Sequence, residues 1–383
     1  MNNSFPKKSV MLVAGEISGD MHGAYLIRAL REGNIKYNLS FVGLGGPRMM
    51  EEGLKNTCDL TDKATIGFFE IFKYFPKIYN AFNKARKLIQ TEKPDLLVLI
   101  DYQGFNVRLA KYAKRNNIKV IYYIAPQEWI WGTIKGGKNV IENTNKIITV
   151  FREEDEFYKK LGGNTEYVGH PILDITEDFE KEINLKNNNE DIIGLFPGSR
   201  HQEIDKILPL IILIAKGIKE KRPNVRFLLA LSSELFLDKV NKIIKDSGIE
   251  IEIVKNKGKE VINNSTLIIT ASGTITLEAA IIGKPMIVLY KLSRLSYYFA
   301  KYVLRIKLPY ISLPNIILKK MAVFEYVQNK IKINDIINKS IQLLDDKKLK
   351  EDINRNLKKV KELLGEKGAV KRASEIILKE LNS

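Results

Sequence analysis

Short apolar runs alternate along most of the chain with longer segments in which apolar residues recur every three or four positions. The segments with helical spacing include 25–31, 78–90 and 107–115. Strands that alternate with amphipathic helices build parallel sheets. The first half therefore predicts a doubly wound α/β domain. Its expected strands are 10–14, 39–42, 96–100, 120–124 and 147–150.

The same rhythm starts again after "EINLKNNNED" at 182–191, a polar stretch that we interpret as a linker. The expected strands of the second half are 192–196, 226–230, 250–254, 267–270 and 286–289. After about residue 330 the chain shows only helical patterns. We therefore expect two Rossmann-like domains, 1–182 and 191–345, and helices at 346–383 that pack back across them. Such sheets bind ligands outside the carboxyl ends of their strands.

The composition narrows the classes of function. A formal net charge of +17 favours polyanions or an anionic membrane surface as partners. The chain shows no zinc-finger, helix-turn-helix or ribonucleoprotein signature, so we do not expect nucleic acid binding. Cys58 is the only cysteine, and three scattered histidines lack metal-ligand spacing, so we expect neither a disulfide nor a metal.

The amino-terminal residues lack the apolar core and cleavage site of a secretory signal. Every uninterrupted apolar stretch is far shorter than the ~20 residues that a membrane-spanning helix needs. We therefore expect a cytoplasmic protein.

Two turns in the second half resemble phosphate-binding loops. The first is "FPGSR" at 196–200, where Gly198 and Ser199 follow a strand and precede a helix. A helix N-terminus favours an anion, and the Arg200 guanidinium matches phosphate oxygens. A surface turn with a solvated arginine is the alternative.

The second turn is "ASGTITLE" at 271–278. Ser272, Gly273 and Thr274 could offer amides and hydroxyls to a diphosphate, and Glu278 could bind ribose hydroxyls. Alternatively, Ser272 or Thr274 only caps the helix. Together the two turns predict a nucleotide diphosphate site in the second domain.

The corresponding loop of the first domain is acidic. "GEISGD" at 15–20 carries Glu16 and Asp20 around Ser18 and Gly19. A carboxylate about 4 Å from a phosphate oxygen would oppose binding by ~1–4 kcal/mol, whereas it accepts hydrogen bonds from sugar hydroxyls. We therefore expect a neutral sugar here. Capping of the helix by Ser18 and Asp20, with Glu16 solvated, is the alternative.

A general base is expected at the end of the strand "LLVLI". Asp101 follows this strand directly, and burial beside an apolar wall can raise the pKa of such a carboxylate. Glu16 and His22 compete for the role. His170 is better suited to organising the crossover between the domains, and His201 lies on an expected helix.

Two stretches combine aromatic and basic residues, 66–89 and 294–311. Interfacial helices place aromatic side chains on one face and cations on the other. With the net charge, this predicts docking on an anionic bilayer and an acylated substrate. Amphipathic helices that face the protein core are the alternative.

Several motifs in order resemble the lipid-A-disaccharide synthase family: "VAGEISGDMHGA", "GLGGPRM", "FPGSR..EI", "ASGT.TLEAA" and "SLPNII". The resemblance runs from about residue 10 to 330. It implies two Rossmann-like domains that face a central cleft in a GT-B architecture, without metal or cofactor, on the cytoplasmic face of the inner membrane. The implied reaction joins UDP-2,3-diacylglucosamine to 2,3-diacylglucosamine 1-phosphate with inversion, releasing UDP; a homodimer stays open.

The resemblance also assigns residues. Arg200 and the block at 272–278 would hold UDP, and Arg200 would also act in catalysis. Glu16, Ser18 and Asp20 would line the sugar side, with Asp101 as the base. The remaining assigned UDP-side residues are Asn315, Glu325 and Gln328.

The chain departs from the commoner family form at two places. Gly104 stands where that form has a second aspartate, and "APQEWIWG" at 125–132 differs from the usual pattern. The alternatives to the family activity are a UDP-N-acetylglucosamine 2-epimerase and a non-catalytic membrane-docking protein with a nucleotide site. A dinucleotide-binding protein is disfavoured because the first loop lacks G-x-G-x-x-G.

Overall fold

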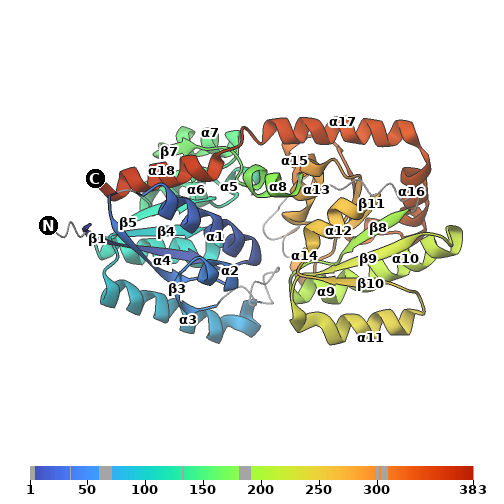
Figure 1. Ribbon diagram of the computed structural model, residues 1–383, viewed down its shortest axis with the longest axis horizontal. Coiled ribbons are helices and arrows are strands. Elements are labelled where there is room, and N and C mark those ends of the chain that lie inside the picture. The colour runs from blue at the N-terminus through green and yellow to red at the C-terminus, as the bar shows by residue number, and fades with distance from the viewer. Residues whose placement is uncertain are drawn as a thin grey trace. The chain divides into compact units, whose positions relative to one another are not determined.

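The computed structural model describes residues 5–34, 36–59, 71–131, 133–180, 191–298, 302 and 309–382. Contacts divide these residues into two units (Figure 1). The first comprises the described residues up to 59, then 71–175 and 364–382. The second comprises those from 176 to 363. The expected linker lies outside the described residues except for Asp191.

The first unit has a parallel sheet of seven described strands in the order β3-β2-β1-β4-β5-β6-β7. The strands are β1 (Lys7–Ala14), β2 (Asn38–Leu44), β3 (Lys55–Cys58), β4 (Leu96–Ile100), β5 (Lys119–Tyr123), β6 (Lys146–Thr149) and β7 (Thr165–Tyr167). The helices are α1 (Ile17–Glu32), α2 (Pro47–Glu51), α3 (Ile71–Glu92), α4 (Gln103–Arg115), α5 (Glu128–Trp131), α6 (Ile134–Asn143), α7 (Arg152–Lys160), the start of α8 (Ile172–Glu180) and α18 (Ala369–Asn382).

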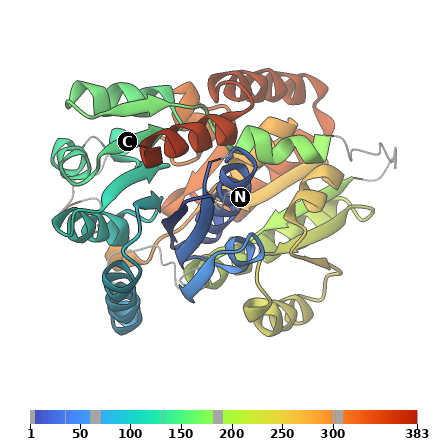
Figure 2. The same ribbon diagram turned by 60° about the vertical axis from the view of Figure 1, so that its left-hand side comes forward.

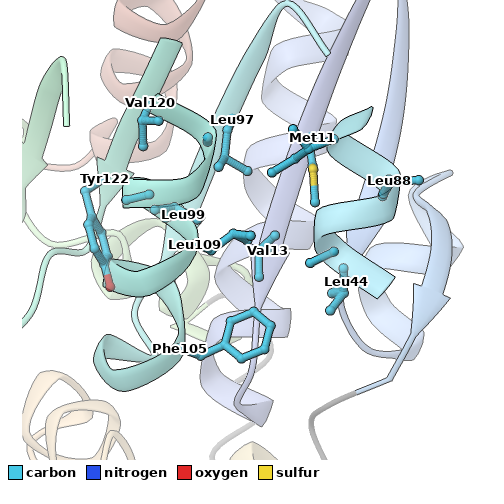
Figure 3. Close-up of a cluster of buried hydrophobic side chains, with 14 of the residues drawn as sticks. Met11, Val13, Leu44, Leu88, Leu97, Leu99, Phe105, Leu109, Val120 and Tyr122 are labelled. Carbon is cyan, nitrogen blue, oxygen red and sulfur yellow. The ribbon is translucent and has the colours of Figure 1, made fainter. Parts of the chain in front are cut away.

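The core of this unit lies between the central strands and helices α3 and α4. Met11 and Leu97, on the neighbouring strands β1 and β4, are fully buried, and Leu109 of α4 packs into the same cluster (Figure 3). All five residues of β4 are buried. A parallel strand covered by helices on both faces carries such a continuous apolar run. The run therefore positions Asp101 at the carboxyl edge of the sheet.

Helix α18 completes the first unit from a distant part of the sequence. It packs against α1, and the two helices lie side by side in both views (Figures 1 and 2). Asp174 accepts hydrogen bonds from the amides of Gly368 (2.6 Å) and Val370 (2.8 Å) at the start of the helix. Arg372 donates to the carbonyl of Val168 at 2.7 Å. Residues 369–382 are thus fixed to the first unit.

The second unit has a parallel sheet of six described strands in the order β10-β9-β8-β11-β12-β13. The strands are β8 (Ile192–Phe196), β9 (Arg226–Leu231), β10 (Glu252–Lys255), β11 (Leu267–Ala271), β12 (Met286–Tyr290) and β13 (Phe324–Val327). The helices are α9 (His201–Lys206), α10 (Leu208–Lys221), α11 (Leu237–Ser247), α12 (Gly258–Asn264), α13 (Ile275–Ile282), α14 (Arg294–Tyr298), α15 (Leu313–Leu318), α16 (Ile333–Asp345) and α17 (Lys347–Leu363).

The prediction of two doubly wound α/β units is confirmed. All ten expected strands are present, with ends shifted by at most three residues, whereas β3, β7 and β13 were missed. The expected interfacial stretches are covered only in part, because 66–70, 299–301 and 303–308 lie outside the described residues. Within the described part of the chain, no helix is both long and apolar enough to cross a membrane.

Candidate functional site

The turn after β8 is occupied by a carboxylate of its own chain. Oε2 of Glu203 accepts hydrogen bonds from the amides of Ser199 (2.7 Å) and Arg200 (3.2 Å). Gly198 has φ +105°, and a Cβ there would overlap the Glu203 side chain. The expectation that this turn leaves its amides free for a phosphate is therefore wrong, because Glu203 satisfies two of them.

Glu203 also orients the guanidinium of Arg200. Nη1 of Arg200 donates to Oε1 of Glu203 at 3.1 Å. Burial raises the pKa of Tyr290 to about 12. Of the two nearby charges, Arg200 lowers this pKa and Glu203 raises it. A small, solvent-open pocket is lined by Glu203, Ser272, Tyr290 and Lys291, among others. Glu203, which lines this pocket, thus holds the Arg200 side chain in place.

The turn after β11 has two amides that the described part of the chain does not use. The amide of Ser272 donates to Leu289 (3.2 Å), and its hydroxyl donates to Ile311 (3.3 Å). Thr274 makes no side-chain cap on α13. Among the described residues, no hydrogen bond uses the amides of Gly273 or Thr274, and a Cβ at Gly273 would meet nothing within 4 Å. This helix N-terminus is therefore suited to an anion.

Asn315 and Glu325 brace the second unit. Asn315 is fully buried. Its amide group donates to Val323 and Glu325 and accepts from the amides of Ala322 and Val323, all between 2.6 and 2.9 Å. The Asn315 side chain uses both of its N–H donors and accepts two hydrogen bonds within its own unit. The structure therefore does not support a direct contact of Asn315 with UDP.

Glu325 is likewise surrounded by donors from its own chain. Its carboxylate accepts from the amide of Ile311, from the amide and hydroxyl of Ser312, and from Asn315. These bonds fix the segment from which Ile311 contacts Ser272. These bonds give Glu325 a supporting role within its own unit, and its expected contact with the ligand stays a prediction.

Gln328 follows β13 at the carboxyl edge of the same sheet. Its φ of +52° is uncommon for a residue with a side chain. Its Nε2 is buried and makes no hydrogen bond to the described residues. Strained backbone and an unsatisfied buried donor are both typical of ligand sites. Glu278 is half-buried on the first turn of α13.

In the first unit, Glu16 lies at the carboxyl end of β1, directly before α1. The ring of Tyr102 lies against Gly15, where a Cβ would overlap it. Burial raises the pKa of Tyr102 to about 12, with a further contribution from Glu16. Glu16 is half-buried and lies close enough to Tyr102 to contribute to the raised pKa of its hydroxyl.

Asp20 supports a neighbouring loop. It is buried and accepts from the amides of Gly46 (2.7 Å), Arg48 (3.1 Å) and Met49 (3.1 Å). Burial raises the pKa of Asp20, although these amides act in the opposite direction. The expectation that Asp20 lines the sugar side is corrected, because its oxygens hold α2. The capping alternative also fails, since Glu16 is the N-cap residue of α1.

Ser18 and Gly19 lie in the first turn of α1. Ser18 is half-buried, whereas Gly19 is buried. A Cβ at Gly19 would lie 3.3 Å from the Cβ of Ala14. Gly19 therefore allows α1 to pack closely on the sheet.

Asp101 lies in strained backbone. Asp101, Tyr102 and Ile124 have φ values of +48°, +50° and +58°. The carbonyl of Asp101 accepts from the hydroxyl of Tyr122 (2.7 Å) and from Nδ2 of Asn106 (2.8 Å). Positive φ is rare for residues with side chains and persists only where the surroundings enforce it. The fold thus fixes the position of the half-buried Asp101 at this edge.

Two buried acids at this edge were missed in the sequence. Glu128 follows β5 and accepts from Nε2 of Gln103, and burial raises its pKa. Glu154 follows β6, accepts from the amides of Val150 (2.8 Å) and Phe151 (3.3 Å), and has its pKa raised to about 8 by burial. The available signal was their position just after an expected strand.

The three histidines have mainly packing contacts. The rings of His22 and His170 meet edge to face at 6.1 Å, and burial lowers the pKa of His170. Nδ1 of His170 accepts from the amide of Ile172 at 3.1 Å, next to the start of α8. His201 packs against Phe236 at 4.8 Å. Among the described residues, no group of three or more His, Cys, Asp or Glu side chains could hold a metal ion.

Solved structures share this fold at low sequence identity. The putative UDP-N-acetylglucosamine 2-epimerase from Listeria monocytogenes aligns with TM-score 0.66 at 14% identity, over 98% of this chain and 95% of that chain. The S. aureus MnaA-UDP co-structure aligns with TM-score 0.69 at 15% identity, over 98% and 97%. The two Rossmann-like units thus have the fold of GT-B-type UDP-sugar enzymes, as expected.

Sequence comparison defines the family. The profile of lipid-A-disaccharide synthetase matches residues 10–380. Lipid-A-disaccharide synthase of Geobacter metallireducens is 37% identical over 382 residues, which cover 98% of each chain. The chain belongs to the lipid-A-disaccharide synthase family and is a glycosyltransferase. The resemblance expected from the motifs is confirmed.

Proposed function

We propose that the protein joins UDP-2,3-diacylglucosamine to 2,3-diacylglucosamine 1-phosphate with inversion, giving the lipid A disaccharide 1-phosphate and UDP. The observation that carries the proposal is the contrast between the two carboxyl edges. Arg200 and the amides of Gly273 and Thr274 lie at the edge of the second sheet, and Glu16 and Asp101 lie at the edge of the first. The first set suits an anion, and the second suits hydroxyl groups.

The second unit would bind the UDP part of the donor. The amides at the start of α13 receive the diphosphate, since they have no other described partner. Arg200, which Glu203 orients, adds positive charge. Glu278 accepts from ribose hydroxyls, and the buried amide of Gln328 donates to the nucleotide.

The first unit would bind the acceptor sugar. The primary hydroxyl of the acceptor attacks the anomeric carbon of the donor, and the bond from this carbon to the UDP oxygen breaks. The attacking hydroxyl transfers its proton to the carboxylate of Asp101. Arg200 and the α13 N-terminus stabilise the negative charge on departing UDP.

Acylated substrates would be reached at an anionic inner-membrane surface. Tyr79 on α3 is 58% exposed, and Leu295, Tyr298 and Tyr302 are 68%, 51% and 62% exposed. Exposed aromatic and aliphatic side chains on a basic protein favour an interfacial position. Flotation with vesicles that contain anionic lipid, compared with neutral vesicles, tests this docking.

The reaction is tested by incubating the protein with both monosaccharide substrates and separating the products by mass. Disaccharide phosphate and UDP in equal amounts are expected. UDP-N-acetylglucosamine alone should yield no epimerised sugar. Epimerisation without disaccharide formation would replace the proposal with the epimerase alternative, and inactivity toward both would support a non-catalytic role.

A further inference from the structure

Glu128 is a buried acid at the carboxyl edge of the first sheet. Its side chain is covered by α6, where a Cβ at Gly136 would overlap the carboxylate. The residue is 3% exposed, and Oε1 accepts a hydrogen bond from Nε2 of Gln103. An acid this deeply buried is rare unless it has a partner. Its described partner is an exposed amide.

This contact fixes the orientation of the Gln103 amide. Nε2 of Gln103 faces Glu128 and donates to it, as a carboxylate that only accepts hydrogen bonds requires. The carbonyl oxygen of Gln103 is then turned to the other side of the amide. No hydrogen bond to this oxygen occurs within the described residues. Glu128 therefore makes Gln103 a directed hydrogen-bond acceptor.

Gln103 also lies where a substrate is expected. It is the first residue of α4 and follows Asp101 and Tyr102, both with positive φ. A Cβ at Gly104 would have no atom within 4 Å, so the surface beside Gln103 is open. The strained turn thus places Asp101 and Gln103 two positions apart at one edge of the sheet.

We propose that the carbonyl oxygen of Gln103 accepts a hydrogen bond from a hydroxyl of the acceptor sugar, and that Glu128 is the positioning residue that directs it. This inference rests on the proposed function. It assigns acceptor recognition to an uncharged amide oxygen beside the proposed base.

The test is a reciprocal exchange. Glu128→Gln leaves two amides without a fixed orientation, and Gln103→Glu sets two carboxylates against each other. The double variant, Gln103→Glu with Glu128→Gln, restores one carboxylate-to-amide bond and an acceptor oxygen at position 103. Each single variant should raise the acceptor KM by ~2- to 12-fold, the range for one hydrogen bond, and leave the donor KM unchanged.

The double variant should return the acceptor KM to within about twofold of the wild type, because the pair is coupled. Glu156→Gln, an exposed substitution on α7, is the matched control and should change neither KM. Melting temperatures separate loss of folding from loss of recognition. A double variant no better than Gln103→Glu, or an equal rise in both KM values, would overturn the inference.

Calorimetric titration of the acceptor into UDP-saturated protein measures the acceptor Kd without turnover. The Kd values should follow the same order among the variants as the KM values. If the wild type forms no disaccharide but the variants still change the acceptor Kd in this order, the proposed reaction fails and the inference stands. If the wild type forms disaccharide and the Kd values do not follow the exchange, the inference alone fails.

Discussion

The two units share one sheet architecture and differ in what stands at its carboxyl edge. In the second unit, the turn after β8 presents Arg200, and the turn after β11 presents the amides of Gly273 and Thr274, which have no partner among the described residues. The acids Glu203 and Glu325 accept hydrogen bonds from donors of their own chain. In the first unit, Glu16, Asp101 and Glu128 lie at or near the strand ends. The same fold thus presents opposite charge through a few turn residues.

The comparison also shows that an acid in a motif is not by itself a ligand contact. Asp20 and Glu325 each accept hydrogen bonds from at least three groups of their own chain. Asp20 holds the start of α2, and Glu325 holds the segment from which Ile311 contacts Ser272. Supporting acids of this kind occur in both units, so the difference between the edges lies in the remaining groups.

The largest expected effect is loss of the base at the first edge. Asp101→Asn should lower kcat by ~10²- to 10⁴-fold, the contribution of general base catalysis, with UDP affinity unchanged. Initial rates at saturating substrate and a UDP titration measure the two quantities. Glu16→Gln is the matched variant for the competing base, and a larger fall in kcat there would move the role to Glu16.

The burial of Glu154 at the first edge should make the free energy of unfolding depend on pH. Burial raises the pKa of Glu154 to about 8, so the folded protein keeps this proton where the unfolded chain loses it. Stability should therefore fall as pH rises from ~4.5 to ~8 and level off above, by about 3–5 kcal/mol in total. Glu154→Gln should remove this part of the pH dependence.

Urea unfolding of both proteins at pH 5 and pH 9 measures the Glu154 effect. Glu153→Gln, a half-buried neighbour on the same helix, serves as the control. An identical pH dependence in the wild type and Glu154→Gln would contradict the expectation.

The next largest effect is expected from removing the positive charge of Arg200 at the carboxyl edge of the second sheet. Arg200→Ala should lower kcat by ~10²- to 10³-fold, because charge on departing UDP loses a positioned donor. Stability should change little, since the ion pair that the Arg200 side chain forms with Glu203 among the described residues is partly exposed. Arg226→Ala, at the amino end of β9, is the matched control and should keep full activity. Unchanged kinetics for Arg200→Ala would refute its role.

The smallest effect tests the bracing of the second edge. Asn315→Ala leaves buried groups around Ala322 and Glu325 without partners and should lower the free energy of unfolding by ~1–3 kcal/mol. UDP affinity, measured where the variant is folded, should fall by less than that of Arg200→Ala. A loss of UDP binding without loss of stability would restore the direct contact expected from the sequence.

Most strands could be predicted because a buried parallel strand carries an uninterrupted apolar run. β4 and β8 were located to the residue for this reason. The missed strands β3, β7 and β13 are the outer strands of their sheets. β7 and β13 are three or four residues long and lack fully buried positions, so they have no such run.

The turns that bear Gly198 and Gly273 could also be located, because a glycine between a strand and a helix is a local signal. The partners of the acids could not. Asp20 finds its donors near residue 46, and Glu128 finds Gln103, each about 25 positions away. Backbone amides look alike in a sequence, so only the fold reveals which carboxylate they occupy.

Helix α18 belongs to the first unit although residues 176–363 precede it in translation. While the ribosome makes the second unit, the surface of α1 that α18 covers remains open to solvent in the nascent chain, and Asp174 lacks the amides of Gly368 and Val370. The half that emerges first is thus finished last. The first unit can be completed by α18 only after the whole second unit has been synthesised.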